Sequence, residues 1–168
     1  KIEEALSTAD AIESLAEEFA DKHHSLFLGR GAQYPIAMEG ALKLTELAYI
    51  QAQAYPSGEL KHGPLALIDK DMPVVAFIPN DENAPLNIAN VEEVFARGGK
   101  FLLLVDEGVA LPAHFHDEMS VIMLPTGLTV ARSLTDVLPL QILSYLVTEA
   151  LGYNIDKPRS LAKSVTVQ

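Results

Sequence analysis

Three charged residues stand at helical spacing in an otherwise apolar stretch, and they are the first candidates for chemistry. Glu39, Lys43 and Glu46 lie at i, i+4 and i+7, which places them on one face about 60° wide if residues 34–51 form a helix. A carboxylate beside an ammonium group can move a proton and stabilise developing negative charge. A solvated Glu39–Lys43 ion pair, worth only a few tenths of a kcal/mol, is the alternative that the spacing leaves open.

A histidine and a basic carboxyl-terminal segment offer further groups for proton transfer or anion binding. Glu59 and His62 lie three residues apart next to glycines. The pKa of histidine near neutrality suits proton transfer, although a lone loop histidine is more often structural or solvated. Residues 157–168 carry three cations and no acidic side chain in a chain of formal net charge −11. Such a segment can attract an anionic ligand, and a frayed terminus is the alternative.

Two other patterns carry weaker signals. Residues 29–31 read Gly-Arg-Gly between an apolar run and a helical stretch. Glycines there let a ligand approach backbone N–H groups, but a tight turn is the simpler interpretation. The pairs at 23–24 and 114–116 hold two histidines each and have no third ligand at metal spacing. We interpret them as surface residues, and we expect neither a metal nor a cofactor.

Composition excludes several classes of protein. The 168 residues are 49% hydrophobic and include no cysteine, so disulfides and a thiol nucleophile are excluded. The net charge of −11 argues against nucleic-acid and anionic-membrane binding, and no apolar run reaches the roughly 18 residues of a membrane span. We expect a cytoplasmic protein because the first twenty residues are acidic and amphipathic rather than a secretory signal. Because position 1 is Lys, we expect a fragment or a processed product.

The elements that must position these residues alternate along the chain. Apolar runs predict strands over 25–28, 51–55, 74–78, 101–105 and 119–124. Periodicity predicts helices over 8–21, 34–51, 57–62, 84–97 and 131–151, with a loop over 106–117. This pattern is typical of an α/β fold with a five-stranded parallel sheet and helices on both faces. Ligands then sit beyond the carboxyl ends of the strands.

Four stretches together carry a family resemblance: LGRG at 28–31, EGALKL at 39–44, GELKHGPLALI at 58–68 and LAKSVTV at 161–167. The chain resembles the carboxyl-terminal part of the glutamine–fructose-6-phosphate aminotransferase (isomerizing) family, also called the glucosamine-6-phosphate synthases. The resemblance covers nearly the whole chain. It implies the second of two sugar isomerase (SIS) subdomains, a flavodoxin- or Rossmann-like fold, over residues 1–152. A tail over residues 153–168 would then close over the sugar site.

The resemblance also implies an activity and its residues. The family makes glucosamine 6-phosphate from fructose 6-phosphate and glutamine-derived ammonia, without a metal or cofactor. Glu46 would move the proton between C1 and C2, His62 would open the sugar ring from a neighbouring subunit, and Lys163 would form a Schiff base with the open-chain ketose. The residues expected to bind or orient the sugar and the base, or to organise the tail, are Glu39, Lys43, Arg159 and Ala162. The implied partners are the first SIS subdomain, a glutaminase domain and a second copy in a homodimer.

One departure and two alternatives accompany the resemblance. The family's Ser/Thr-rich phosphate loop belongs to the first subdomain, and no equally Ser/Thr-dense loop follows a strand here. We therefore expect half of an active site, which alone binds fructose 6-phosphate weakly and has little or no activity. The alternatives are a regulatory SIS module that binds a sugar phosphate and a fructosamine-phosphate deglycase-like SIS enzyme. The joint presence of Glu46, His62 and Lys163 favours the aminotransferase.

Overall fold

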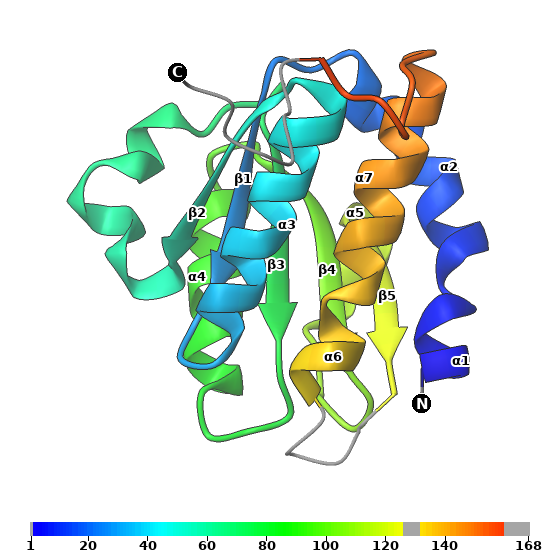
Figure 1. The fold of residues 1–168 in the computed structure, drawn as a ribbon. Helices are drawn as coiled ribbons and strands as arrows, with labels where there is room; N and C mark the ends of the chain where they lie inside the picture. Colours follow the sequence, from blue (N-terminus) through cyan, green and yellow to red (C-terminus); the bar gives the residue numbers. More distant parts are fainter. Residues whose placement is uncertain (1, 126–131, 160–168) are drawn as a thin grey trace, which may run out of the picture.

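Five parallel strands form the centre of the fold (Figure 1). The computed structural model describes residues 2–125 and 132–159. The strands are β1 (His24–Gly29), β2 (Gln51–Pro56), β3 (Pro73–Ile78), β4 (Lys100–Asp106) and β5 (Ser120–Leu124), in the spatial order β2-β1-β3-β4-β5. Strand β3 is buried along its whole length, as expected where helices cover both faces of a parallel sheet. The predicted five-stranded α/β fold is confirmed.

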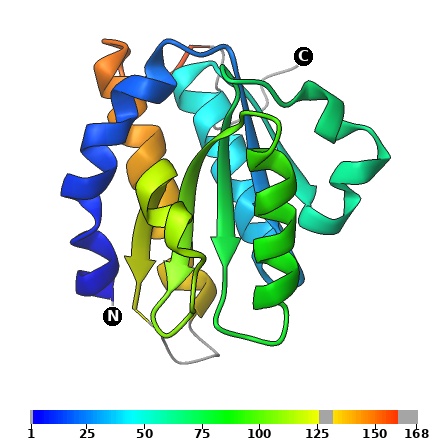
Figure 2. The ribbon, with the colours of Figure 1, turned by 180° about the vertical axis from the view of Figure 1, so that it is seen from behind.

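Helices cover both faces of this sheet (Figures 1 and 2). One face carries α2 (Ala9–Ala20), α3 (Gln33–Ala48) and α7 (Leu138–Ala150), with the short helices α1 (Ile2–Leu6) and α6 (Arg132–Asp136). The other carries α4 (Ala84–Phe95) and α5 (Ala113–Glu118). The two hydrophobic cores follow this division. Ile12, Leu44 and Leu143 belong to the first core, and Leu60, Val94 and Phe115 to the second.

The strand order locates the edge where ligands bind in folds of this kind. The chain moves from β1 to β2 through α3 on one side, and then returns to β3 on the other side of β1. Successive strands are therefore added on opposite sides of β1. In folds of this kind ligands bind where this reversal occurs, between β1 and β3 at the carboxyl ends of the strands. Gly29 ends β1 there, and a Cβ at this position would collide with the backbone of Gln33. A glycine is thus required for the close approach of β1 to the start of α3.

Two predictions about helices are wrong. The single helix expected over 131–151 is divided into α6 and α7 at Val137. Pro139 lies in the first turn of α7, where its missing N–H leaves no hydrogen bond unmade, so it begins a helix instead of continuing one. The expected loop over 106–117 contains most of α5, which buries Phe115 completely. A single aromatic residue in a short polar stretch is too little periodicity to predict a helix.

An arm leaves the sheet beyond β2. It consists of two 3₁₀ helices, η1 (Ser57–His62) and η2 (Pro64–Leu67), which stand out from the edge of the sheet in Figure 1. The short helix expected over 57–62 is therefore confirmed as η1. Leu60 anchors the arm in the second core, and Lys61 forms a 2.7 Å ion pair with Glu93 of α4. The arm is fixed to the α4 side of the sheet.

Candidate functional site

Helix α3 carries the predicted stripe of charges, and the structure brings its three members together. Lys43 Nζ lies 2.8 Å from Glu46 Oε2 and 3.7 Å from Glu39 Oε1. The side chains are 25–38% exposed, so the stripe is neither buried nor freely solvated. The opposite face of α3 packs Ile36, Ala37 and Leu44 into the first core. The helix thus presents an ordered carboxylate–ammonium–carboxylate row on its outer side.

The electrostatics of this row determine what Lys43 can do. The hydrogen bond to Glu46 raises the pKa of the Lys43 ammonium above its ordinary value; partial burial opposes this effect and the Glu39 charge adds to it. These contacts favour the protonated form of Lys43, which is not nucleophilic. A fixed cation beside a carboxylate is suited to stabilise negative charge where that carboxylate removes a proton.

The structure separates His62 from this row. His62 is on η1, with its side chain 74% exposed and its Nε2 3.9 Å from Glu59. Glu59 and His62, three residues apart in the sequence, thus lie close together on η1. Because η1 is tied to α4, it belongs to the face of the sheet opposite α3. The exposed imidazole on a projecting arm is available to a second molecule.

The described part of the tail begins beside the same helix. Gly152, with φ of 70°, turns the chain back after α7, and the backbone N–H of Arg159 donates a 2.7 Å hydrogen bond to the Tyr49 hydroxyl. Tyr49 is three residues after Glu46. The structure therefore places Arg159 next to the carboxyl-terminal end of α3. Lys163 and Ala162 lie outside the described residues.

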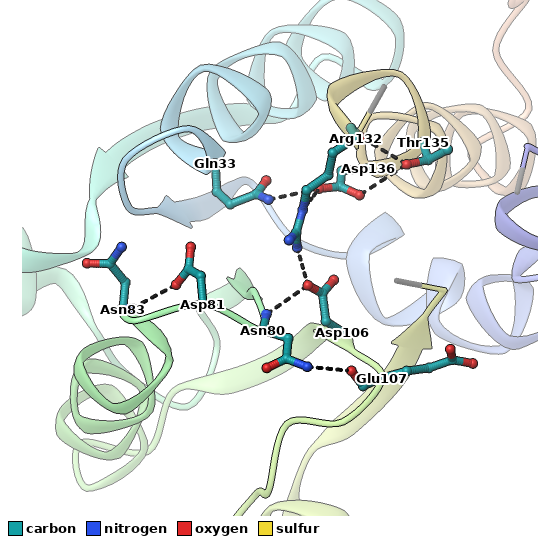
Figure 3. Close-up of polar contacts among 9 residues, drawn as sticks. All are labelled: Gln33, Asn80, Asp81, Asn83, Asp106, Glu107, Arg132, Thr135 and Asp136. Carbon is teal, nitrogen blue, oxygen red and sulfur yellow. Dashed lines mark hydrogen bonds and ion pairs between the residues drawn. The ribbon is translucent and has the colours of Figure 1, made fainter. Parts of the chain in front are cut away.

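A buried polar network that the sequence analysis missed lies at the carboxyl ends of β3 and β4 (Figure 3). Arg132 pairs with Asp106 at the end of β4 and donates a 2.9 Å hydrogen bond from Nε to Asp136. Asp136 also accepts a 2.8 Å bond from Gln33 at the start of α3, and Asp106 accepts a 2.7 Å bond from the backbone N–H of Asn80. The two carboxylates are almost fully buried. The sequence signal that could have predicted this network is Asp106, an acidic residue that directly follows the apolar run of β4.

This network limits which ligands can bind at the carboxyl ends of β3 and β4. Burial raises the pKa of the Asp106 carboxyl above its ordinary value, while the Asn80 N–H and the Arg132 guanidinium act in the opposite direction. Two carboxylates share one guanidinium, so the network does not attract an anion. Arg30, the cation after β1, donates to Asn90 of α4 at 3.1 Å. Arg30 and Arg132, the two cations described at these strand ends, thus both bind side chains of the protein itself.

An open groove runs along α3 beside the charged row. Its volume is about 610 Å³. Met38 and Leu42 of α3 are about half exposed in it, and Glu39 lies at its wall. The groove continues onto β2, the edge strand of the sheet. This apolar surface beside the charged row is suited to contact another protein domain.

Metal-ligand clusters and membrane-spanning helices are both absent from the described part of the chain. Residues 2–125 and 132–159 contain no group of three or more metal-ligating side chains. His114, one of the paired histidines, instead lies 3.2 Å from Glu92 of α4. In the same two ranges, no helix has the length and apolar character needed to cross a bilayer.

Comparisons with known proteins agree with this architecture. The SIS domain family matches residues 18–148. Glutamine–fructose-6-phosphate aminotransferase [isomerizing] of Shewanella oneidensis is 56% identical over the whole chain, and that of Escherichia coli K12 is 52% identical. The chain spans 27% of the length of each of these relatives.

Solved structures show the same similarity. The C-terminal domain of glucosamine-fructose-6-phosphate aminotransferase from Francisella tularensis matches 93% of this chain with a TM-score of 0.86 and 48% identity, and the chain covers 43% of it. A tagatose-6-phosphate ketose/aldose isomerase from Escherichia coli matches with a TM-score of 0.73 at 18% identity, which indicates a shared fold alone.

Proposed function

The chain belongs to the SIS domain family, and from this premise we propose that it is the second SIS subdomain of an isomerising glutamine–fructose-6-phosphate aminotransferase. The observation that carries the proposal is the row on α3, where a protonated Lys43 lies 2.8 Å from the Glu46 carboxylate. A ketose–aldose isomerisation needs a base that moves a proton between adjacent carbons and a cation beside the enediolate that forms. Glu46 is the base, and Lys43 supplies the positive charge.

Lys163 is the residue that forms the Schiff base with the ketose. A Schiff-base lysine must be neutral when it attacks the carbonyl carbon, whereas the ion pairs of Lys43 with Glu46 and Glu39 favour its charged form. The family resemblance assigns the Schiff base to Lys163. Arg159, next to α3, begins the segment that contains Lys163 four residues later. Four residues span at most about 14 Å, which is the greatest separation that the chain allows between the backbones of Arg159 and Lys163.

His62 opens the sugar ring in the site of a neighbouring subunit. Its exposure on an arm tied to α4, on the face of the sheet opposite Glu46, supports action on a second copy. The first SIS subdomain supplies the phosphate-binding loop and contacts the groove beside α3. A glutaminase domain of the same protein supplies ammonia, and the assembly works in the cytoplasm.

Reductive trapping tests the proposed chemistry. The full-length protein that carries this sequence is incubated with fructose 6-phosphate and borohydride, and the reduced adduct is located by mass spectrometry. We expect the adduct on Lys163, because borohydride reduces the imine to a secondary amine that does not hydrolyse. Lys163→Ala should lose both the adduct and aminosugar formation while glutamine hydrolysis remains measurable. Unimpaired aminosugar formation in that variant would remove Lys163 from the mechanism. An absent adduct in the folded wild-type protein would favour the regulatory module.

Mixed dimers test the position of His62. We expect Glu46→Gln and His62→Ala to be nearly inactive separately. When the two variants are unfolded together and reassembled, a mixed dimer contains one site with both an intact Glu46 and an intact His62, provided that His62 acts across the interface. Random pairing should then restore about a quarter of the wild-type activity. The measurement is the rate of aminosugar formation in the mixture. No recovery, with mixed dimers detected by native mass spectrometry, would place His62 in the site of its own subunit.

A further inference from the structure

The residue that follows α3 adopts a backbone conformation that its side chain does not favour. Tyr49 has φ of 60° and ψ of 24°, the left-handed region, and it is the sole described non-glycine residue with positive φ. Glycine and asparagine are the usual occupants of such a position at a helix end. A bulky aromatic residue there is retained when its side chain makes interactions that outweigh the strain.

The ring of Tyr49 holds a residue from the other end of the sequence. The Tyr49 hydroxyl accepts the Arg159 backbone N–H at 2.7 Å, and the Arg159 guanidinium carbon lies 4.0 Å from the ring centroid. Tyr153 packs against the same ring, with centroids 5.0 Å apart and planes tilted by 49°. One side chain thus contacts both the backbone and the cation of Arg159. We call these three residues, Tyr49, Tyr153 and Arg159, the tyrosine clasp.

The position of the clasp connects it to the charged row. The left-handed turn at Tyr49 ends α3 and directs the ring away from the helix toward residues 153–159. Glu46 is less than one helical turn before Tyr49, on the same rigid element. The clasp therefore joins the end of the helix that carries the proposed base to the first residues of the carboxyl-terminal segment.

We infer that Tyr49 is a positioning residue for isomerisation: through its hydroxyl and its ring it holds Arg159, and so fixes residues 153–159 beside the end of the helix that carries Glu46. The inference rests on the proposed function for its effect on catalysis. The contacts themselves do not depend on that proposal. A simple helix stop would require only the left-handed backbone, which glycine adopts more readily than tyrosine.

Two substitutions separate a positioning role from a helix stop. Tyr49→Gly keeps the left-handed turn and removes the clasp, whereas Tyr49→Phe keeps the ring under the guanidinium and removes the hydrogen-bond acceptor. Tyr145, about half exposed on α7, offers matched controls in Tyr145→Phe and Tyr145→Ala. A helix stop predicts a fully active Tyr49→Gly enzyme. A positioning role predicts a loss of activity in Tyr49→Gly.

The experiment uses the full-length protein and two readouts. We expect kcat for aminosugar formation to fall between about tenfold and a hundredfold in Tyr49→Gly, since small misplacements of reacting groups have effects of this size. Tyr49→Phe should lose about fivefold, the equivalent of one hydrogen bond. KM for fructose 6-phosphate and the rate of glutamine hydrolysis should stay near wild type. Hydrogen–deuterium exchange of a peptide containing Arg159 should accelerate in both Tyr49 variants and in neither Tyr145 variant.

Each outcome decides the inference. Wild-type kcat together with wild-type exchange at Arg159 in Tyr49→Gly would overturn it, as would faster exchange without any change in kcat. Should Tyr49→Gly fail to fold, unchanged exchange and unchanged kcat in Tyr49→Phe would overturn it equally. Failure of the proposed function looks different: the wild-type protein would then give no borohydride adduct on Lys163, whatever the exchange at Arg159.

Discussion

Replacing Glu46 with glutamine is expected to lower kcat for aminosugar formation at least hundredfold in the full-length protein. The amide has the shape of the carboxylate and can still accept the hydrogen bond from Lys43, which is 2.8 Å long in the native structure. It cannot take up a proton from carbon. Removal of a positioned general base costs on the order of 10²–10⁴ in rate. Steady-state kinetics with fructose 6-phosphate and glutamine measure the loss.

The matched control for this prediction is Glu149→Gln. Glu149 is exposed on α7, away from the charged row. Its replacement by glutamine is the same carboxylate-to-amide change. We expect it to leave kcat unchanged, while Glu46→Gln also leaves glutamine hydrolysis and the Lys163 adduct measurable. A Glu46→Gln enzyme with more than a tenth of the wild-type kcat would show that another group moves the proton.

Replacing Arg132 with methionine is expected to have the largest effect on stability. Met fills a similar volume but leaves Asp106 and Asp136 as buried carboxylates without their shared cation. Removal of one partner from a buried ion pair costs on the order of 3–5 kcal/mol. The free energy of unfolding of this chain, measured by urea titration, should fall by that amount. Arg97→Met is the control, because exposed Arg97 donates to the carbonyl oxygen of Glu93 alone.

The pH dependence of the Arg132→Met variant follows from the same network. Burial raises the folded-state pKa of Asp106 above its ordinary value of 3.8. The cost of the buried charge is therefore fully present above the folded pKa and is relieved as the pH falls through it. Without Arg132 the pKa of Asp106 rises further, so the stability difference from wild type should shrink between neutral pH and about pH 4. A difference that is independent of pH would contradict this account of the network.

Local periodicity was sufficient to predict most of the fold and one part of the site. Strand β3 was predictable because a fully buried parallel strand requires an unbroken apolar run. The Glu39–Lys43–Glu46 row was predictable because a helix places residues three and four apart on one face, whatever surrounds it. The roles assigned to His62 and Lys163 came from a family resemblance and stay predictions.

Contacts between distant segments were decided by the tertiary structure alone. Asp106, Asp136 and Gln33 come from three elements and meet around Arg132 because strand order and helix docking bring them together. The tyrosine clasp joins residues 110 positions apart in the sequence. Spacing along the chain carries no information about such pairs, since their separation depends on how the layers pack. The sequence by itself thus determined most of the elements and the face of α3 that bears charge. The packing of those elements decided which charges are buried, which side of the sheet carries His62, and where the tail leaves the domain.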